Sequence, residues 1–172
     1  MMFVAATVAI VAAAAVPQLT AGVERTRAAS AARYLAGRLA LARSLAVARS
    51  ANVALLLAAD GGTFTSALYV DGNGNGVRTR EIAAGIDSPI APPVRLADVF
   101  PHVVLSLNDP GDTLAPDTSA LLSFTPTGTA SSRTVYLRGR DGSQYAVRVL
   151  GATGRTRVLR YVSSTRAWIE VL

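Results

Sequence analysis

The segment AASAARYLAGRLALARSLAVARSANV, residues 28–53, decides how this chain is built. Its apolar residues recur mostly at spacings of four and three, which places them on one stripe of an α-helix. A one-sided apolar stripe needs a partner surface, so we expect the rest of the chain to pack on this face. The stripe consists of Ala28, Ala32, Leu35, Leu39, Ala42, Ala46 and Val53.

The preceding segment, MFVAATVAIVAAAAV at residues 2–16, is uncharged and ends at Pro17. As a helix it would measure ~22 Å, which is shorter than the ~30 Å hydrocarbon core of a bilayer. No linker separates it from the amphipathic stretch, so we expect one helix over residues 1–51. Its first part, about 2–23, would lie in a membrane or filament core, and about 24–51 would be amphipathic. The alternative is a cleaved signal peptide, with small residues near Ala13 and Ala15.

Residues 52–172 have the pattern of a β domain. Short alternating segments are separated by turn clusters rich in Gly, Asp, Asn and Pro, which favours an antiparallel sheet. The predicted fold class is therefore α+β, with residues 87–118 as a long surface excursion. The expected strands are 53–57, 64–70, 103–107, 121–124, 133–138, 144–150 and 155–162.

Composition narrows the function classes. The chain has no cysteine, which excludes disulfides and thiolate chemistry. Its single histidine, His102, has no acid closer in sequence than Asp98, and no Ser-His-Asp order is present, so we expect no enzymatic activity. The net charge of +6 divides into +5 over residues 1–50, −5 over 51–132 and +6 over 133–172. All 17 basic residues are arginine, so this asymmetry also fits a bias in amino-acid usage.

Several motifs together resemble the GspH/FimT family of pseudopilins and minor type IV pilins, and the resemblance covers nearly the whole chain. It implies a pilin-like fold, with a long N-terminal helix packed on an antiparallel β domain. The motifs are the uncharged run ending at Pro17, Ala42-Arg43-Ser44, the loop from Val70 to Gly76, Phe124-Thr125-Pro126-Thr127-Gly128 and Gly154-Arg155-Thr156-Arg157.

The resemblance implies a structural subunit of a type IV pilus or a type II secretion pseudopilus, placed at or near the filament tip. It implies insertion in the bacterial inner membrane by a single helix, with the β domain periplasmic or outside the cell in the filament. The implied partners are other pilin or pseudopilin subunits, a prepilin peptidase and the membrane before assembly. The family's start, a glycine followed by Phe-Thr-Leu-Ile-Glu, does not occur here. We expect it in the codons upstream of Met1; the alternative is a copy that is not processed.

The motif Gly154-Arg155-Thr156-Arg157 resembles the Gly-Arg-x-Arg sequence with which FimT-type minor pilins bind DNA. Alternation places Arg155 and Arg157 on one strand face, and a hairpin closed at 151–154 would set Arg148 opposite Arg157. No acid lies in residues 142–169, and Tyr161 is the expected aromatic neighbour on the strand. The alternatives are backbone-driven DNA binding in natural transformation and a solvated hairpin.

The loop Asp71-Gly72-Asn73-Gly74-Asn75-Gly76 resembles the first half of a calcium loop. Asp71, Asn73 and Asn75 would be the ligands, but the closing acid is missing because position 82 is Ile82 and Glu81 falls one residue early. A hairpin turn rich in Gly and Asn explains the same sequence without an ion. We expect no cofactor, with calcium as the alternative.

Overall fold

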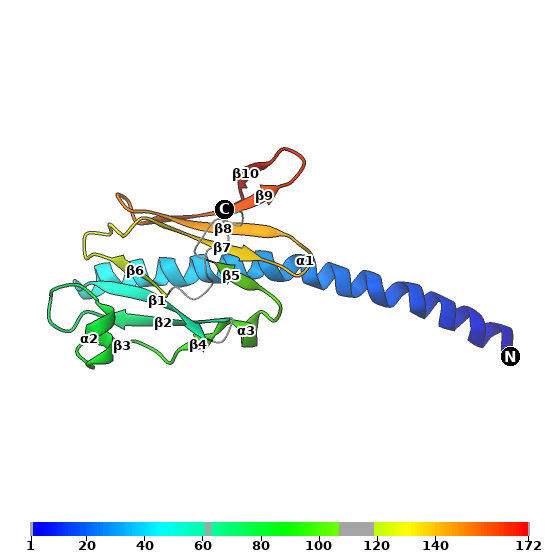
Figure 1. Cartoon of the computed structure of the whole chain (residues 1–172), viewed down its shortest axis with the longest axis horizontal. Helices are drawn as coiled ribbons and strands as arrows, with labels where there is room; N and C mark the ends of the chain where they lie inside the picture. Colours follow the sequence, from blue (N-terminus) through cyan, green and yellow to red (C-terminus); the bar gives the residue numbers. More distant parts are fainter. Residues whose placement is uncertain (1, 61–62, 107–118, 172) are drawn as a thin grey trace.

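The computed structural model describes residues 2–60, 63–106 and 119–171. Figure 1 shows one long helix lying against two sheets, with its first half extending away from them. The elements are α1 (Met2–Arg49), β1 (Val53–Asp60), β2 (Thr63–Val70), α2 (Thr79–Ala83), β3 (Ser88–Pro89), β4 (Val94–Arg95), α3 (Leu96–Val99), β5 (Val104–Ser106), β6 (Ala120–Phe124), β7 (Arg133–Arg138), β8 (Gln144–Leu150), β9 (Arg155–Val162) and β10 (Ala167–Glu170).

The helix α1 is continuous through Pro17 and ends at Arg49. Ser50 then adopts a left-handed conformation, with φ of 48°, which turns the chain toward β1. Val53 is fully buried, but it is the first residue of β1 and does not belong to the helix. Its place in the helical stripe was therefore wrong, because the seven-residue spacing from Ala46 crosses the end of the helix.

No helix within the described residues is long and apolar enough to cross a membrane.

Two antiparallel sheets are formed by the described strands. The first has the order β3-β2-β1-β6, with β4 also paired to β2, and the second has the order β10-β9-β8-β7-β5. Five of the eight pairings between described strands join strands that are consecutive in the sequence, which is expected when short turns connect antiparallel strands. The α+β fold with a long helix on antiparallel sheets is thus as the sequence predicted.

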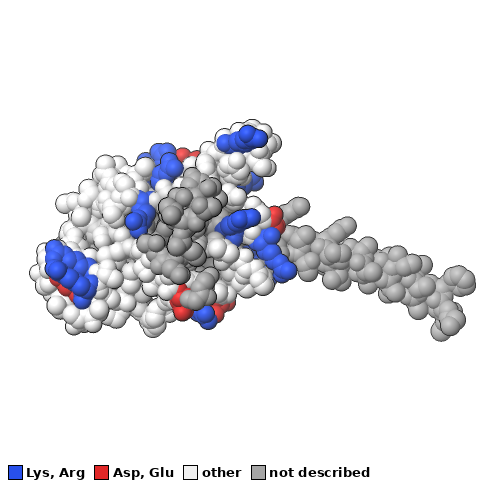
Figure 2. Space-filling view, in the orientation of Figure 1, with Lys and Arg blue, Asp and Glu red and all other residues white. Residues whose placement is uncertain are grey.

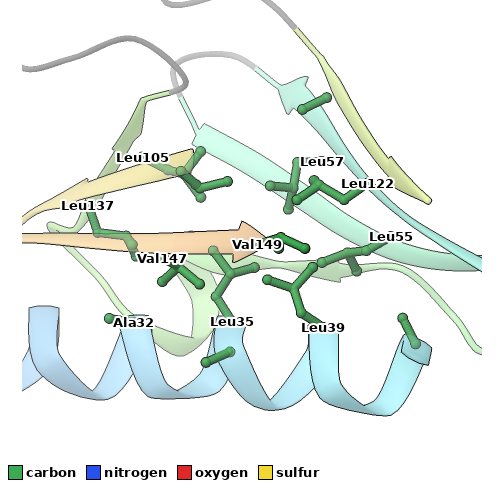
Figure 3. Packing of buried hydrophobic residues seen from close by; sticks show 14 of the residues in the cluster. Ala32, Leu35, Leu39, Leu55, Leu57, Leu105, Leu122, Leu137, Val147 and Val149 are labelled. Atoms are coloured by element: carbon green, nitrogen blue, oxygen red, sulfur yellow. The ribbon is translucent and has the colours of Figure 1, made fainter. Parts of the chain in front are cut away.

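The hydrophobic core lies between α1 and the inner faces of both sheets. In Figure 3, Leu35 and Leu39 of the helix point toward Leu55 of β1 and Val149 of β8. The remaining helical stripe residues, Ala28, Ala32, Ala42 and Ala46, are each fully buried. Alanine at these positions lets strands approach the helix closely, while the two leucines fill the space between the sheets.

All seven expected strands are present, and the structure adds three. The two-residue strands β3 and β4 lie inside the region expected to be a surface excursion, and β10 follows β9 near the C-terminus. Residues 107–118 of that expected excursion lie outside the described residues.

Candidate functional site

The β8–β9 hairpin has the register that the sequence predicted. Leu150 is opposite Arg155, and Arg148 is opposite Arg157. The turn closes when the backbone N–H of Gly154 donates to the carbonyl oxygen of Leu150 at 2.7 Å. Alternation therefore places the three arginines on one face of the hairpin, away from the buried Val147 and Val149, and Arg155, the first residue of β9, also borders α1.

The three guanidinium groups differ in their partners. Arg157 forms an ion pair with Glu170 of β10, with an N–O distance of 3.2 Å. Arg148 donates from Nε to the Thr134 hydroxyl at 3.3 Å, and Arg155 is exposed and takes part in no ion pair among the described residues. The expectation of three unneutralised arginines was wrong for Arg157, because the β9–β10 pairing delivers an acid from outside residues 142–169.

Aromatic side chains gather beside these arginines. Trp168 of β10 is paired with Tyr161 of β9, and their ring centroids lie 5.3 Å apart. Tyr136 of β7 also contacts Trp168, with centroids 5.7 Å apart. All three rings are partly exposed. Trp168 was not expected on this face because β10 was not predicted, and Tyr136 lies in the predicted strand 133–138 but reaches Trp168 only in the folded sheet.

Three of the motifs that carry the family resemblance meet at one point. The guanidinium Nε of Arg43 in α1 donates to the carbonyl oxygen of Gly128 in the β6–β7 loop at 3.2 Å. Gly154 lies against the same carbonyl, and a Cβ at position 154 would collide with it. Gly154 also has a φ of +60°, which favours glycine. The glycine of the Gly-Arg-x-Arg motif thus joins the hairpin to the helix and the β6–β7 loop.

A groove of about 770 Å³ opens beside this junction, between α1 and the start of β9. Eight residues of α1 from Arg33 to Ala48 and Gly154, Arg155 and Thr156 line it. No sequence pattern predicts this groove, because it depends on how the β8–β9 hairpin packs against α1. Figure 2 shows that on the face in view basic side chains lie in several separate groups and not in one continuous basic surface.

The loop after β2 is held together by hydrogen bonds to Asp71. Its carboxylate accepts the backbone N–H groups of Asn73, Gly74 and Gly76 and the side-chain amide of Asn52, at 2.7–3.1 Å. Partial burial acts to raise the pKa of Asp71, but these hydrogen bonds outweigh it and hold the pKa below its ordinary value of 3.8.

The other two expected calcium ligands face Glu81. The amide nitrogens of Asn73 and Asn75 donate to its carboxylate at 3.5 and 3.1 Å. The acidic groups of this region therefore already accept hydrogen bonds from the loop itself. No group of three or more His, Cys, Asp or Glu side chains within the described ranges is arranged to hold a metal ion. The loop leads into α2 and is not the hairpin turn that the sequence suggested.

The architecture defines a class of protein: pilin-like subunits, in which part of a long N-terminal helix forms the core of an antiparallel β domain. The chain belongs to the GspH family, because the family model described as type II transport protein GspH matches residues 31–154. This confirms the GspH assignment expected from the sequence motifs.

Two solved structures are similar to this chain. One is the minor pseudopilin EpsH from the type 2 secretion system of Vibrio cholerae, with a TM-score of 0.50 and 15% identity over 78% of this chain and 97% of that one. The other is the type IV minor pilin FimU of Pseudomonas aeruginosa PAO1, with a TM-score of 0.49 and 20% identity over 77% of this chain and 88% of that one. The likeness to EpsH shows the fold. No curated protein sequence matches the chain significantly.

Proposed function

We propose that the chain is a minor subunit of a type II secretion pseudopilus or a type IV pilus. The observation that carries this is the division of α1: residues Ala28 to Ala46 form the core of the β domain, while the first half extends beyond it (Figure 1). Such a helix joins a folded domain rigidly to a helical bundle. Membership of the GspH family supports the same role.

The composition of the extending half suits a transfer from membrane to filament. Residues 2–16 are uncharged and rich in alanine. Small side chains let helices approach closely, so leaving a bilayer for a bundle exchanges one apolar environment for another. On this proposal the subunit starts in the inner membrane, is trimmed by a prepilin peptidase and takes a place near the filament tip, with its β domain outside the helical core.

The test is the mature N-terminus of the protein purified from its native cells. We expect mass spectrometry to find an N-methylated phenylalanine at the mature N-terminus, and immunoelectron microscopy to find the subunit at filament ends. A mature chain cut near Ala15, as a signal peptidase would cut it, would contradict the proposal.

A second candidate function is DNA binding by the same subunit during natural transformation. Arg148 and Arg155 lie on one sheet face with the partly exposed rings of Tyr136, Tyr161 and Trp168. Guanidinium groups suit phosphate oxygens, and aromatic rings suit unpaired bases, so this face favours single-stranded DNA.

Salt-dependent binding of single-stranded DNA tests this second function. Arg155→Ala should flatten the slope of log K against log salt by about one unit. Glu170→Gln should increase affinity, because it frees Arg157 from its ion pair. Gln144→Ala, on the same hairpin, is the control. DNA affinity that is unchanged in both test variants would exclude this face as the binding site.

A further inference from the structure

The groove lies between α1 and the start of β9. Its α1 lining runs from Arg33 to Ala48, which corresponds to ~22 Å along the helix axis. Its other side is the β8–β9 turn and the first residues of β9, held in place by the contact of Arg43 with Gly128. The shape is therefore fixed by the fold of the domain.

The floor of the groove consists of small residues. Gly37, Ala40, Ser44 and Ala48 follow one another at spacings of three and four, and all four are exposed. A Cβ at Gly37 would meet nothing within 4 Å, so the space above it is open. Val47, which is 51% exposed, adds an apolar side chain to the lining. Small residues at this periodicity form a channel that accepts a ridge of side chains from another helix.

The rim of the groove is basic. Arg33, Arg43 and Arg155 are the charged residues of its lining, and no acid is among the lining residues. None of these three arginines forms an ion pair with a described residue. Arg33 and Arg155 approach from different elements, so an occupant of the groove would lie between positive charges.

We propose that this groove seats an amphipathic helix of a neighbouring subunit, with small apolar residues against the floor and carboxylates beside Arg33 and Arg155. The charge of the rim selects an acidic partner, and the floor selects a helix over an extended strand. The inference rests on the proposed assembly function and adds to it the surface and the chemistry of the partner.

Binding of synthetic helices to the full chain in lipid nanodiscs tests the surface itself. Two amphipathic peptides of about 15 residues match the groove length, one with glutamates and one with lysines flanking an alanine stripe. We expect the glutamate helix to bind. Arg33→Glu with Arg155→Glu should weaken it about tenfold and should favour the lysine helix instead. Equal binding of the two peptides to the wild-type chain would overturn the proposal.

A variant at Gly37 separates docking from folding. Gly37→Leu fills open space above a helical glycine, so it should raise the melting temperature while abolishing binding of the glutamate helix. Gly37→Ala is the matched control, and it should raise the melting temperature and retain most of the binding. Wild-type affinity in Gly37→Leu would contradict docking at this site.

Labelling in assembled filaments separates this inference from the proposed function. The chain has no cysteine, so Ala40→Cys provides a single thiol on the groove floor and Val104→Cys a control on the exposed strand β5. We expect the thiol at position 40 to be protected from maleimide in filaments and the thiol at position 104 to react. A reactive thiol at position 40 in filaments that contain the subunit overturns the groove proposal alone. Absence of the subunit from filaments overturns the proposed function.

Discussion

At the scale of single residues, the Gly-Arg-x-Arg motif divides into different roles. Gly154 connects the β8–β9 turn to Gly128 and Arg43, Arg155 lies on the rim of the groove, and Arg157 is neutralised by Glu170. The sequence predicted the register that brings Arg148 and Arg157 together, since alternation and a short turn determine it. It did not predict the ion pair, because that depends on a strand with no recognisable turn before it.

Replacing Gly154 by alanine should destabilise the domain strongly. The residue has a positive φ, and an added Cβ would collide with the Gly128 carbonyl, so we expect a loss of about 2–4 kcal/mol in the free energy of unfolding. Gly142→Ala is the control: its φ of +82° is also unfavourable, but it has open space, and we expect a loss of about 1 kcal/mol. Urea unfolding measures both. Equal losses would mean that the close approach has no energetic role.

The carboxylate of Asp71 makes stability depend on pH. Its pKa is lower in the folded state than in the unfolded chain, so its contribution to stability is present above about pH 3.8 and is lost as the pH falls through the folded-state pKa. Asp71→Asn should lower the melting temperature at pH 7. The melting temperature of this variant should also decrease less than that of the wild type as the pH falls from 7 to 2. Thermal unfolding followed by circular dichroism from pH 7 to pH 2 checks this, and parallel curves for both proteins would contradict it.

The same loop gives a clear expectation for calcium. Asp71 already accepts four hydrogen bonds, so we expect excess calcium to leave the melting temperature of the wild-type chain unchanged.

At the scale of elements, α1 was the most predictable part of the chain. A periodic apolar stripe of six alanines and leucines identifies its buried face, because helical geometry alone fixes which residues share a side. β10 was missed because the turn before it, Ser163-Ser164-Thr165-Arg166, contains no Gly, Pro, Asn or Asp. In this turn Arg166 has a φ of 49°, a left-handed conformation that the residue types of the turn do not predict. β3 and β4 are two residues each, too short for a periodic pattern.

The contribution of the helical stripe can be measured at Leu39. This side chain is fully buried between the two sheets, so Leu39→Ala should cost about 2–5 kcal/mol of unfolding free energy. Leu41, two residues along and 43% exposed, provides the matched control, and its alanine variant should lose less than about 1 kcal/mol. Chemical denaturation measures the free energy of unfolding of both variants and of the wild type. Similar losses would mean that the helix does not pack on the sheets through this face.

At the scale of the whole molecule, both sheets use the same helix as their inner wall. Core residues come from α1, from β1, β2 and β6 of one sheet and from β5, β7, β8 and β9 of the other. Neither sheet therefore has a separate hydrophobic core, and we expect the β domain to unfold in one cooperative transition. Acidic and basic residues are unevenly distributed along the sequence. The fold nevertheless pairs Arg157 with Glu170 and Arg95 with Asp60, and the distribution of charge along the chain does not predict these ion pairs.

Removing residues 1–25 should leave this transition unchanged. The truncated chain keeps every buried helical residue whose side chain the structure describes, from Ala28 onward. We expect its melting temperature to match that of the full chain in nanodiscs within about 4 °C, the shift that corresponds to about 1 kcal/mol. Differential scanning calorimetry compares the two. A truncated protein that lost its cooperative transition would show that the first half of α1 stabilises the domain.

The continuity of α1 from Met2 to Arg49 also determines how the molecule bears a load. A pull on the N-terminal end is carried along one continuous helix, in which Pro17 has no backbone N–H to donate, into the layer of side chains packed between both sheets. The force then acts parallel to that layer, so many contacts must slide together before the helix withdraws. A subunit built in this way would resist extraction better than one tethered by a loop, and it would transmit any rotation of its stem directly to the domain.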